Sequence, residues 1–336
     1  ISKKNKSIFL LIIIYIIFQL ICSFVSTNIS EAIWGVFYLT GWLILYLLFS
    51  LYINNQSFKK IIFSTAITGT LLSLLLYNDI YQIFKLTIPS SGKLSATFGY
   101  KNFFAQYLCF VIPACLCSFH LFKTHKMKII MFICTLINLN ALIFTRCRAA
   151  WGGIFLSILI YIIINRAIIY KEITNTFSYK IYLYISIIGI VGFSLFIFQP
   201  IEIEKGIWIG EKSSIKDTIL SIKDINNKST WGGRIDMYQA SFKMLKNYPF
   251  IGTGLENWKI LYPGYSKNDS HIDHKNHKVV LRPHNDLLWI LVETGFIGLL
   301  CFMLFIFYHL KILLNRIRKC NNDENYFILN FCMLSL

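Results

Sequence analysis

Eight long stretches of this chain are apolar and almost free of charge, and they constrain its fold more than any other feature. They are Ile8–Val25, Ala32–Ile53, Ile61–Tyr77, Phe103–Phe122, Ile129–Thr145, Trp151–Asn165, Ile181–Pro200 and Leu287–Leu310. Most reach the roughly 17 to 25 residues that a helix needs to cross a hydrocarbon core of about 30 Å. Charged residues make up only 15% of the chain, against about a quarter of an average soluble domain. The pattern therefore predicts an all-α polytopic membrane protein.

Basic residues gather in alternate connections between these stretches. The clusters are Lys3, Lys4 and Lys6; Lys59 and Lys60; Lys123, Lys126 and Lys128; Arg166, Lys171 and Lys180; and Lys311, Arg316, Arg318 and Lys319. Because Lys and Arg are retained on the cytoplasmic side, we expect a cytoplasmic N-terminus. Residues 1–200 then form seven spans, residues 201–284 a large extracytoplasmic loop with amphipathic helices, and residues 285–336 an eighth span and the start of a ninth. The net charge of +17 reflects this topology, suits anionic lipids and does not indicate nucleic acid.

Two arginines stand in the short connection between the fifth and sixth stretches, within Thr145–Trp151. An arginine at membrane depth is costly unless it snorkels, lines a cavity or binds an anion. Arg146 and Arg148 fall on the predicted outer side, where basic residues are scarce, which favours an anion site. The alternative is an interfacial anchor beside Trp151.

A second basic station lies in the large loop, where Gly232 and Gly233 precede Arg234. The spacing of the apolar residues that follow predicts an amphipathic helix lying on the membrane or on the bundle; they are Ile235, Tyr238, Phe242 and Leu245. The free N–H groups of its first turn, with Arg234 beside them, are typical of a phosphate site. The alternative is an ordinary solvated arginine.

The third station is Arg282-Pro283-His284, directly before the eighth apolar stretch. Proline is favoured at the first position of a helix, so His284 is predicted to lie in the opening turn, at the membrane surface. A neutral imidazole there can accept a proton from a hydroxyl nucleophile, and neighbouring arginines favour the neutral form. A structural histidine is the alternative.

A group of histidines and acids in the loop offers a rival site. Its members are Asp269, His271, Asp273, His274 and His277. Their spacing places only two of the three histidines on one helical face, and the surrounding residues are those of a polar loop. We therefore expect no metal ion and interpret the tract as solvated.

Several segments, in this order along the chain, resemble the O-antigen ligase and polymerase superfamily of membrane glycosyltransferases. They are Gly99–Leu108, Thr145–Ala149, Gly233–Arg234, Pro249–Gly254, Pro283–Asn285 and Glu293–Gly298. The resemblance implies a GT-C-like bundle of about twelve spans in the bacterial inner (cytoplasmic) membrane, with its site under the loop at the periplasmic face. About nine of these spans would be present in this sequence. We expect it to be a fragment, because it has no initiating Met and Tyr326–Leu336 has the composition of a span cut short.

The resemblance also implies the chemistry. The donor is an undecaprenyl-diphosphate-linked glycan, the acceptor a sugar hydroxyl of a glycan or of lipid A-core, and no metal or other cofactor takes part. A ligase, a polysaccharide polymerase and a protein O-oligosaccharyltransferase all fit these motifs.

The first arginine of the family pattern falls on Arg148, because the usual Thr-x-Ser-Arg-Gly reads Thr145–Ala149 here. Cys147 stands in place of the serine and Ala149 in place of the glycine. Arg146 is an additional charge and a rival for the same role.

The second arginine of the family falls on Arg234 and its histidine on His284, and Arg282 is a further diphosphate-binding candidate beside that histidine. His284 is then the catalytic base, and the arginines hold the diphosphate as it leaves. The alternative from another class is a transporter or flippase of polyprenyl-linked glycan. Transporters usually keep charges at the middle of their spans, whereas the charges here concentrate at the outer edge.

Overall fold

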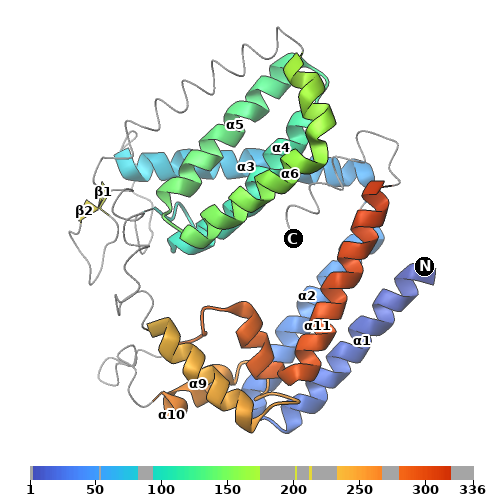
Figure 1. Cartoon of the computed structure of the whole chain (residues 1–336), viewed down its shortest axis with the longest axis vertical. Helices are drawn as coiled ribbons and strands as arrows, with labels where there is room; N and C mark the ends of the chain where they lie inside the picture. Colours follow the sequence, from blue (N-terminus) through green and yellow to red (C-terminus); the bar gives the residue numbers. More distant parts are fainter. Residues whose placement is uncertain are drawn as a thin grey trace. The chain divides into compact units, whose positions relative to one another are not determined.

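The computed structural model describes residues 3–52, 54–81, 94–174, 201–202, 212–213, 233–266 and 280–318. The chain divides into two compact units. Unit 1 comprises Ile1–Ile53 and Lys223–Lys311, and unit 2 comprises Asn54–Ile222 and Ile312–Leu336. The described residues are almost entirely helical (Figure 1); the strands among them are the two-residue β1 (Ile201–Glu202) and β2 (Lys212–Ser213), which pair antiparallel.

Five described helical segments are long and apolar enough to cross a membrane, which confirms an all-α polytopic membrane protein. They are Ile29–Phe49, Asn55–Tyr81, Lys101–Leu121, His125–Phe144 and Asp286–Asn315. Phe9–Phe24 and Arg148–Ile160 are shorter apolar helices. The predicted span at Ile181–Pro200 and the start of another at Tyr326 lie outside the described residues.

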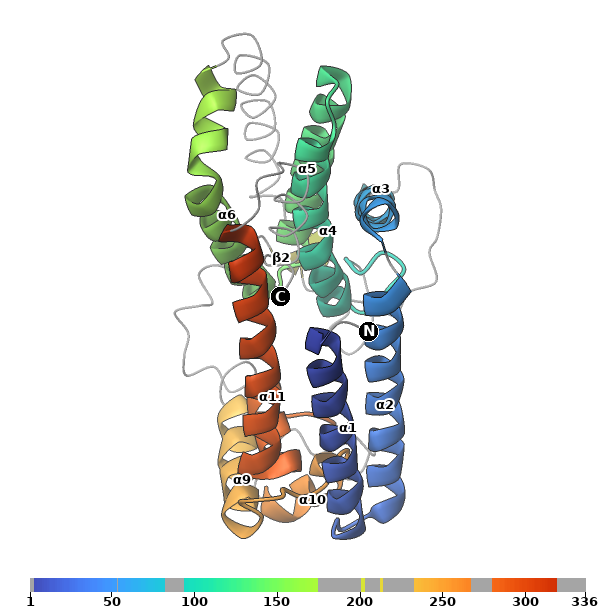
Figure 2. The same ribbon diagram turned by 90° about the vertical axis from the view of Figure 1, so that its right-hand side faces the viewer.

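Unit 2 is built from α3 (Asn55–Tyr81), α4 (Lys101–Leu121), α5 (His125–Phe144) and α6 (Arg148–Thr174). Glycine permits the close approach of α3 to α4, because a Cβ on Gly69 would lie 2.3 Å from the side chain of Val111. Successive helices alternate in direction, so the connection from α3 to α4 and the turn from α5 to α6 lie at the same end of unit 2 (Figures 1 and 2).

A buried polar network fixes the register of α3 against α5 inside unit 2. The Asn138 amide donates to the Thr70 hydroxyl at 2.8 Å and to the Cys134 carbonyl at 2.7 Å, and its oxygen accepts from Ser73 at 2.8 Å. Asn138 and Ser73 are fully buried. A satisfied network of this kind is what an apolar environment requires of buried polar groups.

Unit 1 is built from α1 (Lys3–Phe24), α2 (Ile29–Tyr52), α9 (Gly233–Asn247), α10 (Trp258–Tyr265) and α11 (Asp286–Arg318) up to Lys311. Side-chain bonds tie the turn between α1 and α2 to the loop before α10. The Asn257 side-chain oxygen accepts from the Asn28 backbone N–H at 2.8 Å, and its amide donates to the Asn28 carbonyl at 3.2 Å. Lys259 forms an ion pair with Glu31 at 2.9 Å, and this hydrogen bond raises the pKa of Lys259.

The far ends of α2 and α11 also meet, because the Tyr46 hydroxyl and Nε2 of His309 are hydrogen-bonded at 2.6 Å. The two helices therefore run in the same direction, from the end that holds the turn between α1 and α2. Figures 1 and 2 show α1, α2 and the long part of α11 side by side.

The predicted span over Leu287–Leu310 lies within the candidate span Asp286–Asn315 of α11, but α11 breaks at Gly295, where φ is 67° and ψ is −174°. The ribbon changes direction there (Figure 1). The part after the break, 296–318, is long enough to cross a hydrocarbon core by itself, at about 1.5 Å per residue. A hydropathy pattern cannot separate the parts of α11 before and after Gly295, because both parts are apolar.

The start of α11 also differs from the sequence-based expectation. Pro283 is not its first residue, because the helix begins at Asp286. Asn285 caps it: its side-chain oxygen accepts the Leu288 N–H at 3.1 Å, a bond typical of a strong N-cap residue. His284 therefore lies before the helix rather than in its opening turn, and it has a left-handed backbone, with φ of 55°.

Candidate active site

Two glycine-containing motifs that lie far apart in the sequence form one backbone structure, here called the glycine clasp: residues 249–254 against residues 292–297. The N–H groups of Thr253 and Gly254 donate to the carbonyls of Val292 and Glu293, both at 2.9 Å. In return, the N–H of Phe296 donates to the Pro249 carbonyl at 2.9 Å, and the N–H of Ile297 to the Phe250 carbonyl at 3.3 Å. The backbone groups freed by the break in α11 are thus paired, as membrane depth requires.

Glycine is required on both sides of the clasp. A Cβ on Gly252 would lie 2.4 Å from the carbonyl of Glu293, and one on Gly295 would lie 2.2 Å from the carbonyl oxygen of Phe250. Both residues also have positive φ, 72° and 67°, which glycine adopts without a steric cost. The sequence motifs Pro249–Gly254 and Glu293–Gly298 therefore position α11.

One hydrophobic cluster joins α9, α10 and the first part of α11. Its buried members are Met237, Ala240, Met244, Trp258, Tyr262, Leu288 and Val292. Trp258 is the centre of this cluster: its indole N–H donates to the Ser241 hydroxyl at 2.9 Å, and its ring stacks on Tyr262 with centroids 4.5 Å apart. Its backbone N–H donates to the buried Glu293 carboxylate at 3.2 Å. The cluster and the clasp together fix where α9 and α11 begin.

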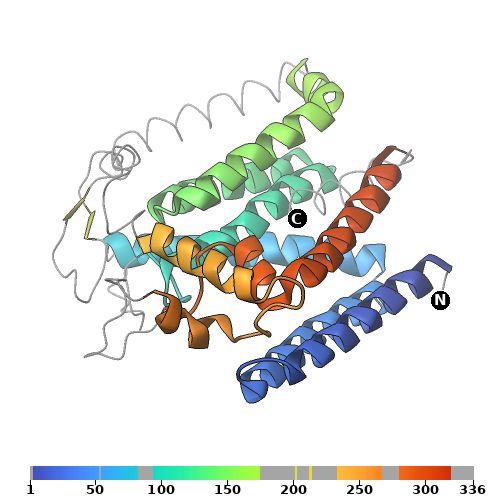
Figure 3. The same cartoon turned by 60° about the horizontal axis from the view of Figure 1, so that its bottom comes forward.

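Three of the candidate residues stand at those helix starts. Arg234 is the second residue of α9 and is exposed. His284, also exposed, lies two residues before α11. The guanidinium of Arg282 lies over the Trp289 ring, 4.4 Å from its centroid, a cation–π contact that orients the side chain. Figures 1 and 3 show that α9 and α11 begin at the same end of this part of unit 1. Arg234 thus stands at the start of α9, and Arg282 and His284 stand directly before the start of α11.

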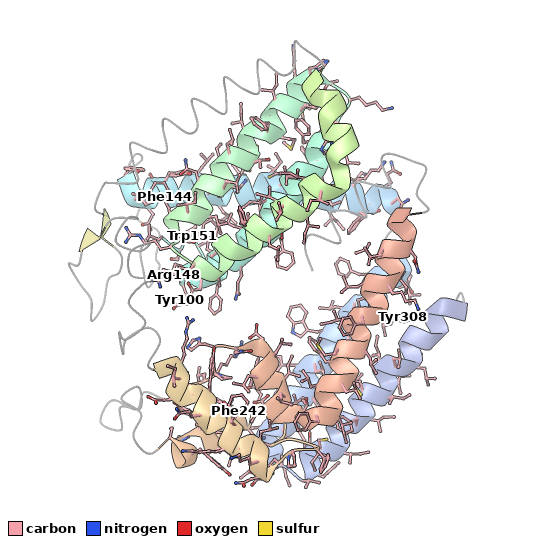
Figure 4. The ribbon with its side chains drawn as sticks, in the orientation of Figure 1. Tyr100, Phe144, Arg148, Trp151, Phe242 and Tyr308 are labelled. Carbon is pink, nitrogen blue, oxygen red and sulfur yellow. The ribbon has the colours of Figure 1, made fainter. Side chains whose placement is uncertain are left out.

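The other two candidates belong to unit 2, in the three-residue turn between α5 and α6. Arg146 has a left-handed backbone, with φ of 57°, and is only 7% exposed. Arg148 is half-buried and is the first residue of α6. The Trp151 indole braces the turn by donating to the Leu142 carbonyl at 2.9 Å. Figure 4 labels Arg148 and Trp151 near Tyr100, which precedes α4.

The electrostatics of this end of unit 2 favour an anion. Helices α4 and α6 begin with Lys101 and Arg148, and neither has an acidic residue in its first turn. The N-terminus of a helix already carries partial positive charge, so a cation there adds to an unfavourable field. Arg146 lies in the turn before α6, and Asp79, in the last turn of α3, supplies a negative charge at this same end of unit 2. A phosphate group bound at the two helix termini would add to that compensation.

Substitution of the two arginines is expected to separate folding from binding. Arg146→Ala removes a buried side chain and should lower the thermal unfolding temperature of the detergent-purified protein. Arg148→Ala removes a half-exposed one and should leave that temperature within about a degree or two, as surface changes usually do, while it weakens transfer more than Arg146→Ala does. A larger loss of transfer in a folded Arg146→Ala variant would move the family arginine to Arg146.

Sequence reasoning missed the roles of Glu293 and Asn257, which hold the loop before α10 rather than contact a substrate. Glu293 had a signal, because a charged residue inside an apolar stretch is rare and calls for a partner. Asn257 had none, because its partners lie at the other end of the sequence. The histidine group at 271–277 lies outside the described residues; within the described part, no cluster of three metal-ligating residues occurs.

Comparison with known proteins gives the class of this chain. The model of the O-antigen ligase family matches residues 133–303, just over half of the 336 residues. The chain belongs to the O-antigen ligase family, and Arg146, Arg148, Arg234, Arg282 and His284 all fall in the matched range.

The name of one similar protein is consistent with this family. A Rickettsia conorii protein named "Putative polysaccharide ligase" is 29% identical over 92 residues. The matched region is 27% of this chain and 22% of that protein, so the chain aligns with about a fifth of the relative's length. No solved structure matches the chain.

Proposed function

We propose that the protein transfers a glycan from an undecaprenyl-diphosphate lipid to a sugar hydroxyl at the outer face of the bacterial inner membrane. The observation that carries the proposal is the placement of Arg234 at the start of α9 and of Arg282 and His284 directly before α11, two helices that one hydrophobic cluster packs together. Arginine side chains suit phosphate oxygens, and histidine is the commonest general base. Membership of the O-antigen ligase family supports a glycan-ligase type of activity.

The reaction is a single displacement. The His284 imidazole accepts the proton of the acceptor hydroxyl, whose oxygen forms a bond to the anomeric carbon of the donor. The bond from that carbon to the diphosphate oxygen breaks, and the undecaprenyl diphosphate leaves with the electron pair. Arg234 binds the diphosphate and stabilises its added charge, and each charge-assisted contact contributes about 1.5–3 kcal/mol. The family resemblance assigns the same role to Arg148. One displacement inverts the anomeric carbon.

The outer location follows from the basic clusters, and one contact in unit 1 supports it. The turn between α1 and α2 is bonded through Asn28 to Asn257, in the large loop. If the turn between α1 and α2 and the large loop both lie outside, they must be at the same end of α1 and α2. The bonds between Asn28 and Asn257 place them at the same end.

Accessibility of engineered cysteines tests this orientation. A cysteine replacing the exposed Asn247, the last residue of α9, should react with a membrane-impermeant thiol reagent in intact spheroplasts. A cysteine replacing the exposed Lys126, in the first turn of α5, should react only after lysis. The unsubstituted protein gives the background of the native cysteines. The reverse pattern would overturn the orientation and the outer site with it.

Arg234→Lys tests the diphosphate role directly. Lysine keeps the charge but lacks the planar fork that binds two phosphate oxygens, so transfer by the purified protein should fall roughly a hundredfold or more. Arg166→Lys, the same change in a predicted cytoplasmic cluster, is the matched control and should keep full activity. Equal activity of the two variants would remove Arg234 from the site.

Gene deletion identifies the acceptor. Loss of glycan from lipid A-core indicates a ligase, loss of long polymer a polymerase, and loss of protein-linked glycan a protein transferase. Accumulation of the lipid-linked donor on the cytoplasmic face would instead favour the transporter.

A further inference from the structure

Helix α9 has two apolar faces, and the protein buries only one of them. The buried face consists of Met237, Ala240, Ser241 and Met244, which pack on α10 and α11. The stripe that the sequence singled out is the other face, here called the outer stripe: Ile235, Tyr238, Phe242 and Leu245. Tyr238 and Leu245 are half-buried, and Tyr238 also packs against the buried cluster. Ile235 is 45% exposed and Phe242 54% exposed, and Phe250, which follows α9, is 67% exposed.

Basic residues border the outer stripe on both sides. At 3.6 residues per turn, Lys243 and Lys246 lie along one border and Arg234 along the other. Both lysines are exposed, and Asp236 is the acidic residue of the helix. An apolar stripe bordered by cations is the arrangement of helices that lie in the headgroup region of a bilayer.

The direction of α9 agrees with this arrangement. Figures 1 and 3 show α9 running across the direction of α1 and α2. Helix α2 contains a candidate membrane span, and α1 contains a shorter apolar helix. Its fold partners, α10 and the loop before it, are bonded to the turn between α1 and α2, where these two helices end. A helix that crosses the bundle direction at the end of the bundle lies close to the plane of the membrane surface.

We propose that the outer stripe of α9 inserts into the surface of an anionic bilayer, with Ile235 and Phe242 among the acyl chains and Lys243 and Lys246 among the headgroups. The start of α9 then lies at the depth of lipid phosphates. If the proposed function holds, this is also where the diphosphate of a lipid-linked donor would meet Arg234. The docking itself does not depend on that function.

Photocrosslinking of the full chain in proteoliposomes tests the docking without any measurement of transfer. In one variant, Phe242 is replaced by the photoreactive residue benzoylphenylalanine. A matched variant carries benzoylphenylalanine in place of Asn247, an exposed residue that lies on the side of α9 away from Phe242. In vesicles of phosphatidylcholine and phosphatidylglycerol, light should attach lipid at position 242 and little at position 247. Lys243→Gln with Lys246→Gln should lower the share of phosphatidylglycerol among the adducts, by up to about fivefold for each lysine.

Three results would overturn the proposal. They are equal lipid attachment at positions 242 and 247, crosslinks from position 242 to the protein itself in place of lipid, and a phosphatidylglycerol share that the lysine changes leave unaltered. The first two exclude insertion of the stripe, and the third excludes recognition of anionic headgroups.

Discussion

Gly295→Ala is expected to prevent the stable folding of unit 1. The new Cβ would lie 2.2 Å from the carbonyl oxygen of Phe250 and 2.3 Å from its carbonyl carbon, and these are backbone atoms that no rotamer change can move. The backbone at Gly295, with φ of 67° and ψ of −174°, belongs to a region that costs other residues about 1–3 kcal/mol. Overpacking adds about 1–3 kcal/mol. The sum, about 2–6 kcal/mol, is a large fraction of the stability of a typical protein.

Gly41→Ala in α2 is the matched control, because a Cβ there meets no atom within 4 Å and alanine favours helix. Both variants are purified in detergent, and the fraction that remains monodisperse in size-exclusion chromatography is followed on heating. Gly295→Ala should aggregate at a clearly lower temperature or fail to accumulate, while Gly41→Ala should match the unsubstituted protein. Equal midpoints for the two variants would mean that the clasp does not hold α11.

The clasp also shows where sequence reasoning reached its limit. The motifs Pro249–Gly254 and Glu293–Gly298 were recognised as segments of the family resemblance. Their pairing was not predicted, because backbone hydrogen bonds between segments about 40 residues apart leave no pattern in either segment. The break at Gly295 was missed for a related reason: hydropathy averages over Leu287–Leu310 and does not register one residue with positive φ.

Helix α9 illustrates the same limit for packing. The period of Ile235, Tyr238, Phe242 and Leu245 predicted an amphipathic helix, and the helix is present. The face that packs inside the protein is a different one, centred on Ala240 and Met244. Periodicity finds apolar faces, but the partner that covers each face is set by tertiary structure, here by Trp258 and Tyr262 of α10.

The membrane class was predictable because repeated charge-free stretches of about twenty residues match the thickness of a bilayer and are rare in soluble proteins. The candidate residues were predictable because arginine and histidine are rare at the outer edge of such stretches. Their grouping was not: Arg234, Arg282 and His284 belong to unit 1, and Arg146 and Arg148 to unit 2. The chemical role of His284 remains a prediction, and it has the largest expected effect on activity.

His284→Ala and His284→Gln are both expected to reduce transfer by roughly a hundredfold to ten-thousandfold, the usual contribution of a general base. Glutamine forms hydrogen bonds like imidazole but does not take up a proton near neutral pH. Binding of the lipid-diphosphate donor should survive in both variants, because the arginines bind the diphosphate. His125→Gln, at the start of α5, is the matched control and should keep full turnover.

The pH and metal dependence of the unsubstituted protein give an independent measure of the same role. Turnover should fall as the pH is lowered through the range in which histidine is protonated, near about 6.5 for an unperturbed side chain, because the protonated imidazole cannot accept the acceptor's proton. Activity should persist in EDTA. Near-normal turnover in His284→Gln would leave His284 as a positioning residue, since hydrogen bonding alone would then suffice. Activity lost in EDTA and restored by zinc would instead move the chemistry to His271, His274 and His277.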